Sequence, residues 1–137
     1  MSACVVDASI ALSWCFEDEA TPETDRLFEY IRDEGAVVPN LWHLELGNVL
    51  LQAERRKRIS AEDVATRLRL ISVLPITTDR ETSAKAWQDT LSIARVEGLT
   101  SYDAAYLELA IRLGVPLMTK DAQLAKAADR RGVATHP

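Results

Sequence analysis

Two aspartates follow short apolar segments in a way that could place carboxylates in a functional cleft. Asp7 comes directly after the run Cys4 to Val6, and Asp121 comes shortly after Leu117 and Met118. Short apolar runs predict buried strands, and ligands of open α/β sheets bind at the carboxyl ends of the strands. Each aspartate could equally cap the helix that begins beside it, so both interpretations stay open on these residues alone.

Two further acids lie near the starts of predicted helices. Glu45 lies about one turn into a helix predicted from about Leu41 to Arg56, and its neighbours are apolar on nearly every side of that helix. Because no lysine or arginine stands three or four residues away, a carboxylate there is costly unless it is paired or coordinates a cation. Asp103 lies three residues after Thr100, where it could also complete a capping box.

A shared site for these carboxylates favours metal chemistry. Two carboxylates ~4 Å apart repel by ~4 kcal/mol at an effective dielectric of ~20. Four of them on one rim could therefore not all stay ionised without a cation or raised pKa values. Oxygen ligands suit Mg²⁺ or Mn²⁺ rather than Zn²⁺. An all-carboxylate cleft is typical of metal-assisted hydrolysis of phosphodiester bonds.

The elements that must position these acids alternate between strands and helices. Five short strands are predicted, at residues 4–6, 36–38, 73–77, 117–118 and 133–134. The alternation predicts an α/β fold, a three-layer α/β/α sandwich with a central parallel β-sheet. Because crossovers between parallel strands are right-handed, the starts of the connecting helices should gather at the rim that carries Asp7.

Capping residues and apolar spacing mark the helices. Thr21 and Pro22 open one that ends at Gly35, Ser60 caps another, and the last runs from Asp121 to Arg131. Two further helices are predicted from the spacing of their inward-facing apolar residues. The first runs from about Arg80 to Gly98, with Ala84, Trp87, Leu91 and Ala94 on its apolar face. The second follows Thr100, with Ala105, Tyr106, Leu109 and Leu113 on its apolar face.

Composition predicts one ordinary globular domain over residues 1–137. The chain is 47% hydrophobic and 27% charged, and no apolar run is long enough to cross a membrane. A net charge of −5 argues against a protein that coats nucleic acid through bulk positive charge, but it does not exclude an enzyme that meets RNA at one cleft. Cys4 and Cys15 are expected to be buried thiols in a reducing cytoplasm.

Four segments in order resemble a known family. They read VVDAS, LWHLELGNVL, LTSYDAAYLELA and LMTKDAQLAKAA. Together they closely resemble PIN-domain ribonucleases, and among these the VapC-like toxins of bacterial type II toxin–antitoxin systems. The likeness covers almost the whole chain, and its most specific part is S-Y-D-A-A-Y-L followed by T-x-D-x-x-L.

The resemblance implies roles for individual residues. Asp7, Glu45, Asp103 and Asp121 match the family's acidic quartet, which binds metal and carries catalysis, while Ser9 and Thr119 match residues that support it. The implied activity is endonucleolytic cleavage of RNA that depends on Mg²⁺ or Mn²⁺. Homodimerisation and inhibition by a small antitoxin encoded alongside are implied as well.

Contacts with RNA are predicted for three cations. Lys120, beside Asp121, and the pair Arg55 and Arg56 could hold phosphates without reading sequence. The two arginines could equally form a solvated helix end that complements the helix dipole. Three aromatic side chains are expected to be core residues or to line a groove for an antitoxin helix, namely Trp14, Phe16 and Trp42.

Two alternatives of other classes stay open. A phospho-accepting receiver domain shares the parallel α/β architecture and would use Asp79 after the third strand, although Asp7 lacks the second acid that such domains carry beside it. A PIN-like interaction module that has lost catalysis is the other alternative. The intact quartet argues against it.

Overall fold

The structure, a computed structural model, describes residues 3–137 around a parallel sheet. Its five strands lie in the order β3-β2-β1-β4-β5, and each pairs with its neighbours in parallel. They are β1 (Cys4–Val6), β2 (Ala36–Val38), β3 (Ile76–Thr78), β4 (Leu117–Met118) and β5 (Thr135–His136). The predicted α/β/α class with a central parallel sheet is confirmed.

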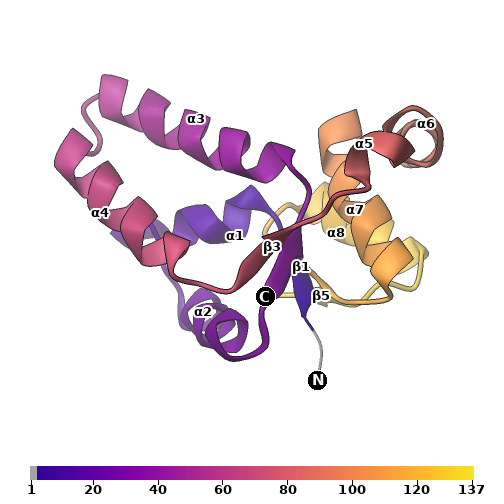
Figure 1. The fold of residues 1–137 in the computed structure, drawn as a ribbon, viewed down its shortest axis with the longest axis horizontal. Helices are drawn as coiled ribbons and strands as arrows, with labels where there is room; N and C mark the ends of the chain where they lie inside the picture. Colours follow the sequence, from indigo (N-terminus) through magenta and orange to yellow (C-terminus); the bar gives the residue numbers. More distant parts are fainter. Residues whose placement is uncertain (1–2) are drawn as a thin grey trace.

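Helices cover both faces of this sheet (Figure 1). The first group, drawn to the left of the strands, comprises α1 (Ala8–Ser13), the short 3₁₀ turn η1 (Glu17–Glu19), α2 (Pro22–Glu34), α3 (Leu41–Arg55) and α4 (Ala61–Ser72). The second group, drawn to the right, comprises α5 (Thr82–Lys85), the π-helical segment η2 (Ala86–Thr90), α6 (Leu91–Glu97), α7 (Ser101–Leu113) and α8 (Ala122–Arg130).

The strand order reverses direction between β1 and β4. From β1 the chain adds β2 and then β3 on one side, crosses back to β4 on the other side of β1, and adds β5 beyond it. Right-handed crossovers therefore place the two groups of helices on opposite faces. The carboxyl ends of β1 and β4 form the topological switch point at which open α/β sheets bind ligands.

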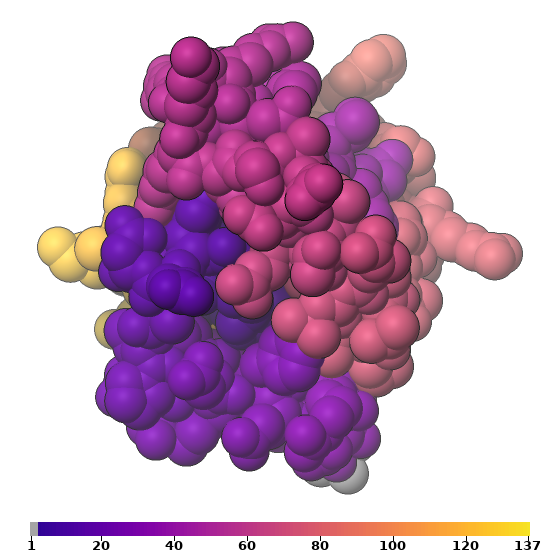
Figure 2. Space-filling model, turned by 90° about the vertical axis from the view of Figure 1, so that its left-hand side faces the viewer, coloured from indigo at the N-terminus to yellow at the C-terminus, as the bar shows by residue number. Residues whose placement is uncertain are grey.

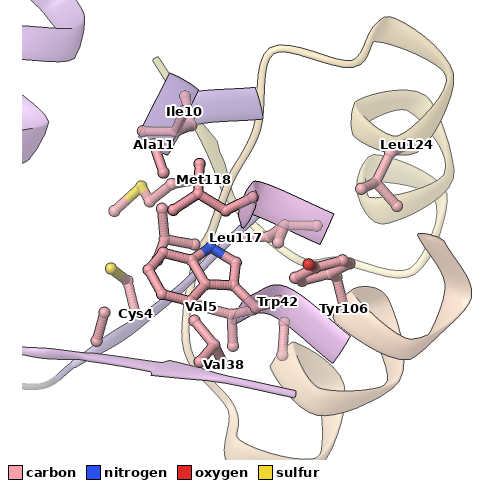
Figure 3. Close-up of a cluster of buried hydrophobic side chains, with 14 of the residues drawn as sticks. Cys4, Val5, Ile10, Ala11, Val38, Trp42, Tyr106, Leu117, Met118 and Leu124 are labelled. Carbon is pink, nitrogen blue, oxygen red and sulfur yellow. The ribbon is translucent and has the colours of Figure 1, made fainter. Parts of the chain in front are cut away.

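The core is centred on β1 and on the helix that covers it. All three residues of β1 are fully buried, and α7 is buried along most of its length and contacts both β1 and β4. Figure 3 shows the centre of this cluster, with Val5, Leu117, Trp42 and Tyr106 among its side chains. A helix buried on most sides carries few surface positions, so any polar group on α7 needs a partner within the protein.

Two strands begin later than predicted. β3 begins at Ile76 rather than Val73, because α4 runs to Ser72 and Val73 keeps a helical conformation as its C-cap. β5 begins at Thr135 rather than Val133, because the Val133 N–H donates to the Ala128 carbonyl and completes the end of α8. In both cases the backbone hydrogen bonds that end a helix displace the start of the strand.

The apolar face predicted after Arg80 was partly wrong. Trp87 is 89% exposed and Ala84 is exposed as well, whereas Thr82, Thr90 and Ile93 are buried. The segment η2 has π-helical turns, which are wider than α-helical turns and so shift the face that later residues present. Leu113, in the last turn of α7, is also exposed instead of buried.

The helix α3 is less enclosed than its sequence predicted. Leu44 is 79% exposed, and Val49 and Leu51 are also exposed, while Trp42, Leu46 and Leu50 face the core. The expectation that α3 has little solvated surface is therefore wrong. Leu44 and Leu51, seven residues apart, lie on one face of α3, and exposed apolar side chains that share a face can form a surface suited to a partner.

Both cysteines are free and buried, as predicted. Burial raises the pKa of the Cys4 thiol to about 12 and that of Cys15 to about 11, so neither is a reactive thiolate. Among residues 3–137, no helix is both long and apolar enough to span a bilayer.

An ion-pair network ties the edge strand to α7. The Arg112 guanidinium donates to both carboxylate oxygens of Asp79, at 3.1 and 2.9 Å, and to both oxygens of Glu108, at 2.8 and 3.1 Å. Asp79 directly follows β3, and its carboxylate also accepts a hydrogen bond from Thr82. The hydrogen bonds from Arg112 hold the pKa of Asp79 at about 2, against its usual 3.8.

We predict that Asp79→Asn lowers the free energy of unfolding by about 2 kcal/mol at pH 7. Because the folded pKa is depressed, the ionised carboxylate stabilises the fold above the unfolded value and loses that contribution as the pH falls from about 4 to about 2. Urea melts across this range should show the difference between the two proteins shrinking. The exposed Asp129→Asn should change stability by no more than about 0.5 kcal/mol, and a pH-independent deficit of Asp79→Asn would contradict this account.

Candidate metal-binding active site

Asp7 occupies the switch point of the sheet. It follows β1, caps α1 by accepting the Ile10 N–H at 3.3 Å, and is only 6% exposed. Two hydroxyls donate to its carboxylate, Ser9 to Oδ1 and Thr119 to Oδ2. Burial raises the pKa of Asp7, and these hydrogen bonds oppose the rise. The capping role and the site role therefore fall to the same carboxylate, and its Oδ1 accepts both the capping Ile10 N–H and the Ser9 hydroxyl.

The two hydroxyls also bind the loop that leaves β4. The Ser9 Oγ accepts the Lys120 N–H at 2.9 Å, and the Thr119 Oγ1 accepts the Asp121 N–H at 3.0 Å. Each hydroxyl thus donates to Asp7 and accepts from the backbone beside Asp121. The supporting positions predicted for Ser9 and Thr119 correspond to direct contacts, and they connect the ends of β1 and β4.

Glu45 comes to the same rim from α3. It is half-buried one turn into the helix, and the Tyr106 hydroxyl of α7 donates to its Oε1. Burial raises the pKa of Glu45, the hydrogen bond from Tyr106 lowers it, and the charges of Asp103 and Asp7 raise it further. Glu45 is therefore near enough to both aspartates to feel their charge.

Asp103 and Asp121 come from the starts of α7 and α8. Asp103 is half-buried in the first turn of α7, where its N–H donates to the N-cap hydroxyl of Thr100. Asp121 is exposed and caps α8, its Oδ1 accepting the N–H groups of Gln123 and Leu124. Burial raises the pKa of Asp103, and the charge of Asp121 raises it further.

The four acids are thus linked by repulsion from one to the next. Glu45 interacts with Asp7 and Asp103, and Asp103 interacts with Asp121. Within residues 3–137 no ion pair involves any of the four, whereas Asp79, Glu97 and Glu108 all pair with arginines. A set of acids that repel one another and make no ion pair with a cationic side chain is a candidate functional site rather than a stabilising network.

The donor set suits a hard divalent cation. All four groups are carboxylates, the ligand type that Mg²⁺ and Mn²⁺ prefer. In the part of the chain that the structure describes, no three His, Cys, Asp or Glu side chains are close enough together to hold an ion as they stand. Ionised carboxylates without a counterion favour side-chain positions that keep them apart, because their repulsion grows as they approach.

The predicted phosphate contacts differ in their surroundings. Lys120 is exposed beside Asp121, with its Nζ 4.0 Å from a Glu19 carboxylate oxygen. Arg55 and Arg56 are exposed at the far end of α3, ~15 Å along the helix from Glu45. The structure brings Lys120 to the rim with the acids and leaves the two arginines at the tip of the α3–α4 hairpin.

The three aromatic side chains predicted for core or groove are all buried core residues, and their edges line two separate hollows. Trp14 and Phe16 line a groove between α1, α2 and α4, which lies on the face that Figure 2 presents. The groove also has Phe28 and Leu70 as apolar lining, and its charged lining comprises Glu17, Asp25, Glu29, Arg32 and Arg67. Trp42 lies instead in a separate hollow with Leu46 and Leu68.

Sequence reasoning missed Tyr106 as a residue of the site. It was expected only to face inward, and it does, with 1% of its surface exposed. Its hydroxyl nevertheless reaches Glu45, which is 61 residues away in the chain. The available signal was its place three residues after Asp103, which puts both side chains on one side of α7.

The fold, the acidic rim at the switch point and the chain's order of motifs agree with one class of protein. Residues 4–130 match the PIN domain family, so the chain belongs to that family. Asp79, on which the receiver alternative depended, is bound by Arg112 and Thr82.

Two relatives come from Pyrobaculum aerophilum. Ribonuclease VapC3 is 27% identical over 122 residues, which cover 89% of this chain and 92% of that protein. The crystal structure of PAE2754 superposes with a TM-score of 0.71 at 24% identity, covering 98% of this chain and 90% of that one. The second likeness supports the fold.

We predict that Glu45→Gln leaves the metal-free protein as stable as the wild type, or more stable by up to about 1 kcal/mol. The raised pKa means that the ionised carboxylate is disfavoured in the folded state, so a neutral amide removes repulsion from Asp7 and Asp103 while its carbonyl still accepts from Tyr106. Urea melts in a chelator at pH 7 measure the change.

A matched control is available on α7. Glu108→Gln makes the same substitution at a buried glutamate that is paired with Arg112, and it should destabilise by about 2 kcal/mol or more. A comparable loss in Glu45→Gln would identify Glu45 as a structural partner instead of a strained site residue.

Proposed function

We propose that the protein is a metal-dependent endoribonuclease and the toxin of a type II toxin–antitoxin system. Asp7, Glu45, Asp103 and Asp121 are the metal ligands and catalytic residues, with Ser9 and Thr119 in support. The observation that carries the proposal is the buried Asp7 at the switch point, linked electrostatically through Glu45 and Asp103 to Asp121. Membership in the PIN domain family and the similarity to Ribonuclease VapC3 support it.

The chain's own groups prepare the site for a divalent cation, Mg²⁺ or Mn²⁺. When bound, such an ion lowers the pKa of a water molecule and offsets negative charge on the scissile phosphate. Ser9 and Thr119 keep Asp7 in one orientation through hydrogen bonds to its two oxygens. Their donation favours the ionised form of Asp7 and opposes the rise in pKa that burial causes.

Substrate binding is proposed to use the cations nearest the rim. Lys120 lies next to Asp121 and can approach an RNA phosphate once it leaves Glu19. Arg55 and Arg56, exposed at the end of α3, are proposed to contact a longer RNA. These contacts neutralise the backbone and carry no sequence preference of their own.

Two protein partners are also proposed. The groove lined by Trp14 and Phe16 suits the apolar face of an antitoxin helix. The exposed Leu44 and Leu51, which share a face of α3, support a homodimer. Cytoplasmic localisation is proposed because both the RNA substrate and the reduced, buried thiols suit that compartment.

The first test is cleavage of single-stranded RNA by the purified protein. We predict cleavage with Mg²⁺ or Mn²⁺, none in excess chelator, and a loss of about 100-fold or more in Asp7→Asn. The matched control is the exposed Asp129→Asn, which should cleave like the wild type. Cleavage in chelator, or an Asp7→Asn protein of undiminished rate, would contradict the metal mechanism.

The second test separates a toxin from an inactive interaction module. We predict that induced expression of the wild type arrests bacterial growth, that Asp7→Asn does not, and that co-expression of the small adjacent reading frame relieves the arrest. Sequencing the RNA ends that appear on induction would identify the RNA that is cut and the cleavage motif. Equal arrest by both proteins would instead favour the interaction module.

A further inference from the structure

We infer that Tyr106 is a positioning residue whose hydroxyl holds Glu45 in the orientation that binds the metal ion. The inference rests on the proposed function and adds to it a residue outside the acidic quartet. Its basis is the hydrogen bond from the Tyr106 hydroxyl to the Glu45 Oε1, which joins α7 to α3.

The contact connects the two helical groups of the fold. Glu45 belongs to α3, in the group drawn on the left of Figure 1, and Tyr106 belongs to α7, in the group on the right. Contacts of the carboxylate within α3 alone would fix it only relative to that helix. The bond to Tyr106 fixes it relative to the helix that also carries Asp103.

The two side chains of this hydrogen bond differ in conformational freedom. Tyr106 is 1% exposed within the packed core, where Figure 3 shows its ring among Leu117, Trp42 and other buried side chains. Glu45 is half-buried at the rim and has three side-chain torsions. A hydroxyl on a rigid ring therefore restrains a carboxylate that would otherwise be mobile, and this restraint is lost if the hydroxyl is removed.

The bond engages one of the two oxygens of Glu45. Oε1 accepts from Tyr106, which leaves Oε2 available to a ligand. Hydrogen-bonded partners of this kind orient metal ligands, and their removal typically costs about 10–100-fold in metal affinity or activity. Tyr106 performs for Glu45 what Ser9 and Thr119 perform for Asp7.

The test is Tyr106→Phe, which keeps the ring and removes only the hydroxyl. We expect Mg²⁺ and Mn²⁺ affinity, measured by calorimetry on the protein alone, to fall by about 10–100-fold. The matched control is Tyr102→Phe, which removes a hydroxyl from an exposed tyrosine one turn earlier on α7 and should bind metal like the wild type. A Tyr106→Phe affinity equal to that of the wild type would overturn the inference.

A double-variant comparison separates positioning from general damage to the fold. In a Glu45→Ala background, Tyr106→Phe should cause no further loss of metal affinity, because the carboxylate that it positions is gone. An equal fold-loss in both backgrounds would overturn the inference. Urea melts without metal accompany the comparison, since a purely structural role would change those melts and leave the metal affinity of the folded protein unchanged.

A measurement on the wild type needs no substitution in the core. With tyrosine carrying ¹³C in its ring, we expect the Tyr106 signal to shift on addition of Mg²⁺, while that of Tyr30 on α2 stays in place. An unmoved Tyr106 signal in a protein that binds Mg²⁺ overturns this inference alone. A wild-type protein that binds neither metal overturns the proposed function as well.

Discussion

The structure depends on the buried carboxylate of Asp7, which lies at the topological switch point between β1 and β4. Asp7 is costly to bury as an anion, and its environment meets that cost with hydroxyl donors from Ser9 and Thr119. Because those hydroxyls also accept the N–H groups of Lys120 and Asp121, the loops that leave β1 and β4 are tied to one group. Through these hydrogen bonds Asp7 helps to fix the position of the Asp121 backbone.

Charge is distributed differently at the rim and elsewhere in the molecule. Asp79 and Glu108 share Arg112, and Glu97 pairs with Arg130 and Arg131, so these acids stabilise the fold. At the rim, neighbouring acids raise the pKa of Glu45 and of Asp103, and none of the four acids has such a partner within residues 3–137. Repulsion among the acids therefore lowers the stability of the fold at the rim. Such local destabilisation is the pattern expected at a functional site that binds a cation.

The rim also lies between the two halves of the molecule. Helix α3 supplies Glu45 from one side of the sheet, while α7 supplies Asp103 and Tyr106 from the other. The hydrogen bond between Glu45 and Tyr106 therefore connects α3 and α7 across the site. The solved structure that superposes with a TM-score of 0.71 shares this fold at 24% sequence identity.

Much of the molecule follows from local sequence. Capping by Thr21, Ser60 and Thr100 marked the starts of three helices correctly, because a side chain and a backbone three residues away are enough to form a cap. The parallel sheet and the rim followed from the alternation of elements and the handedness of crossovers. Trp87 was predicted to be buried but is exposed, because the π-helical turns of η2 change which residues face the core. The spacing of apolar residues does not reveal such turns.

The sequence by itself determined the class of fold, the strand-end location of Asp7 and Asp121, and the family motifs around all four acids. Only the tertiary structure decided how these carboxylates are held: which hydroxyl donates to which oxygen, that Glu45 repels both Asp7 and Asp103, and that Tyr106 reaches Glu45. The physical reason is distance along the chain. Caps and strands form between residues that are neighbours in sequence, whereas the contact between α3 and α7 forms only when the packed core brings the two helices together.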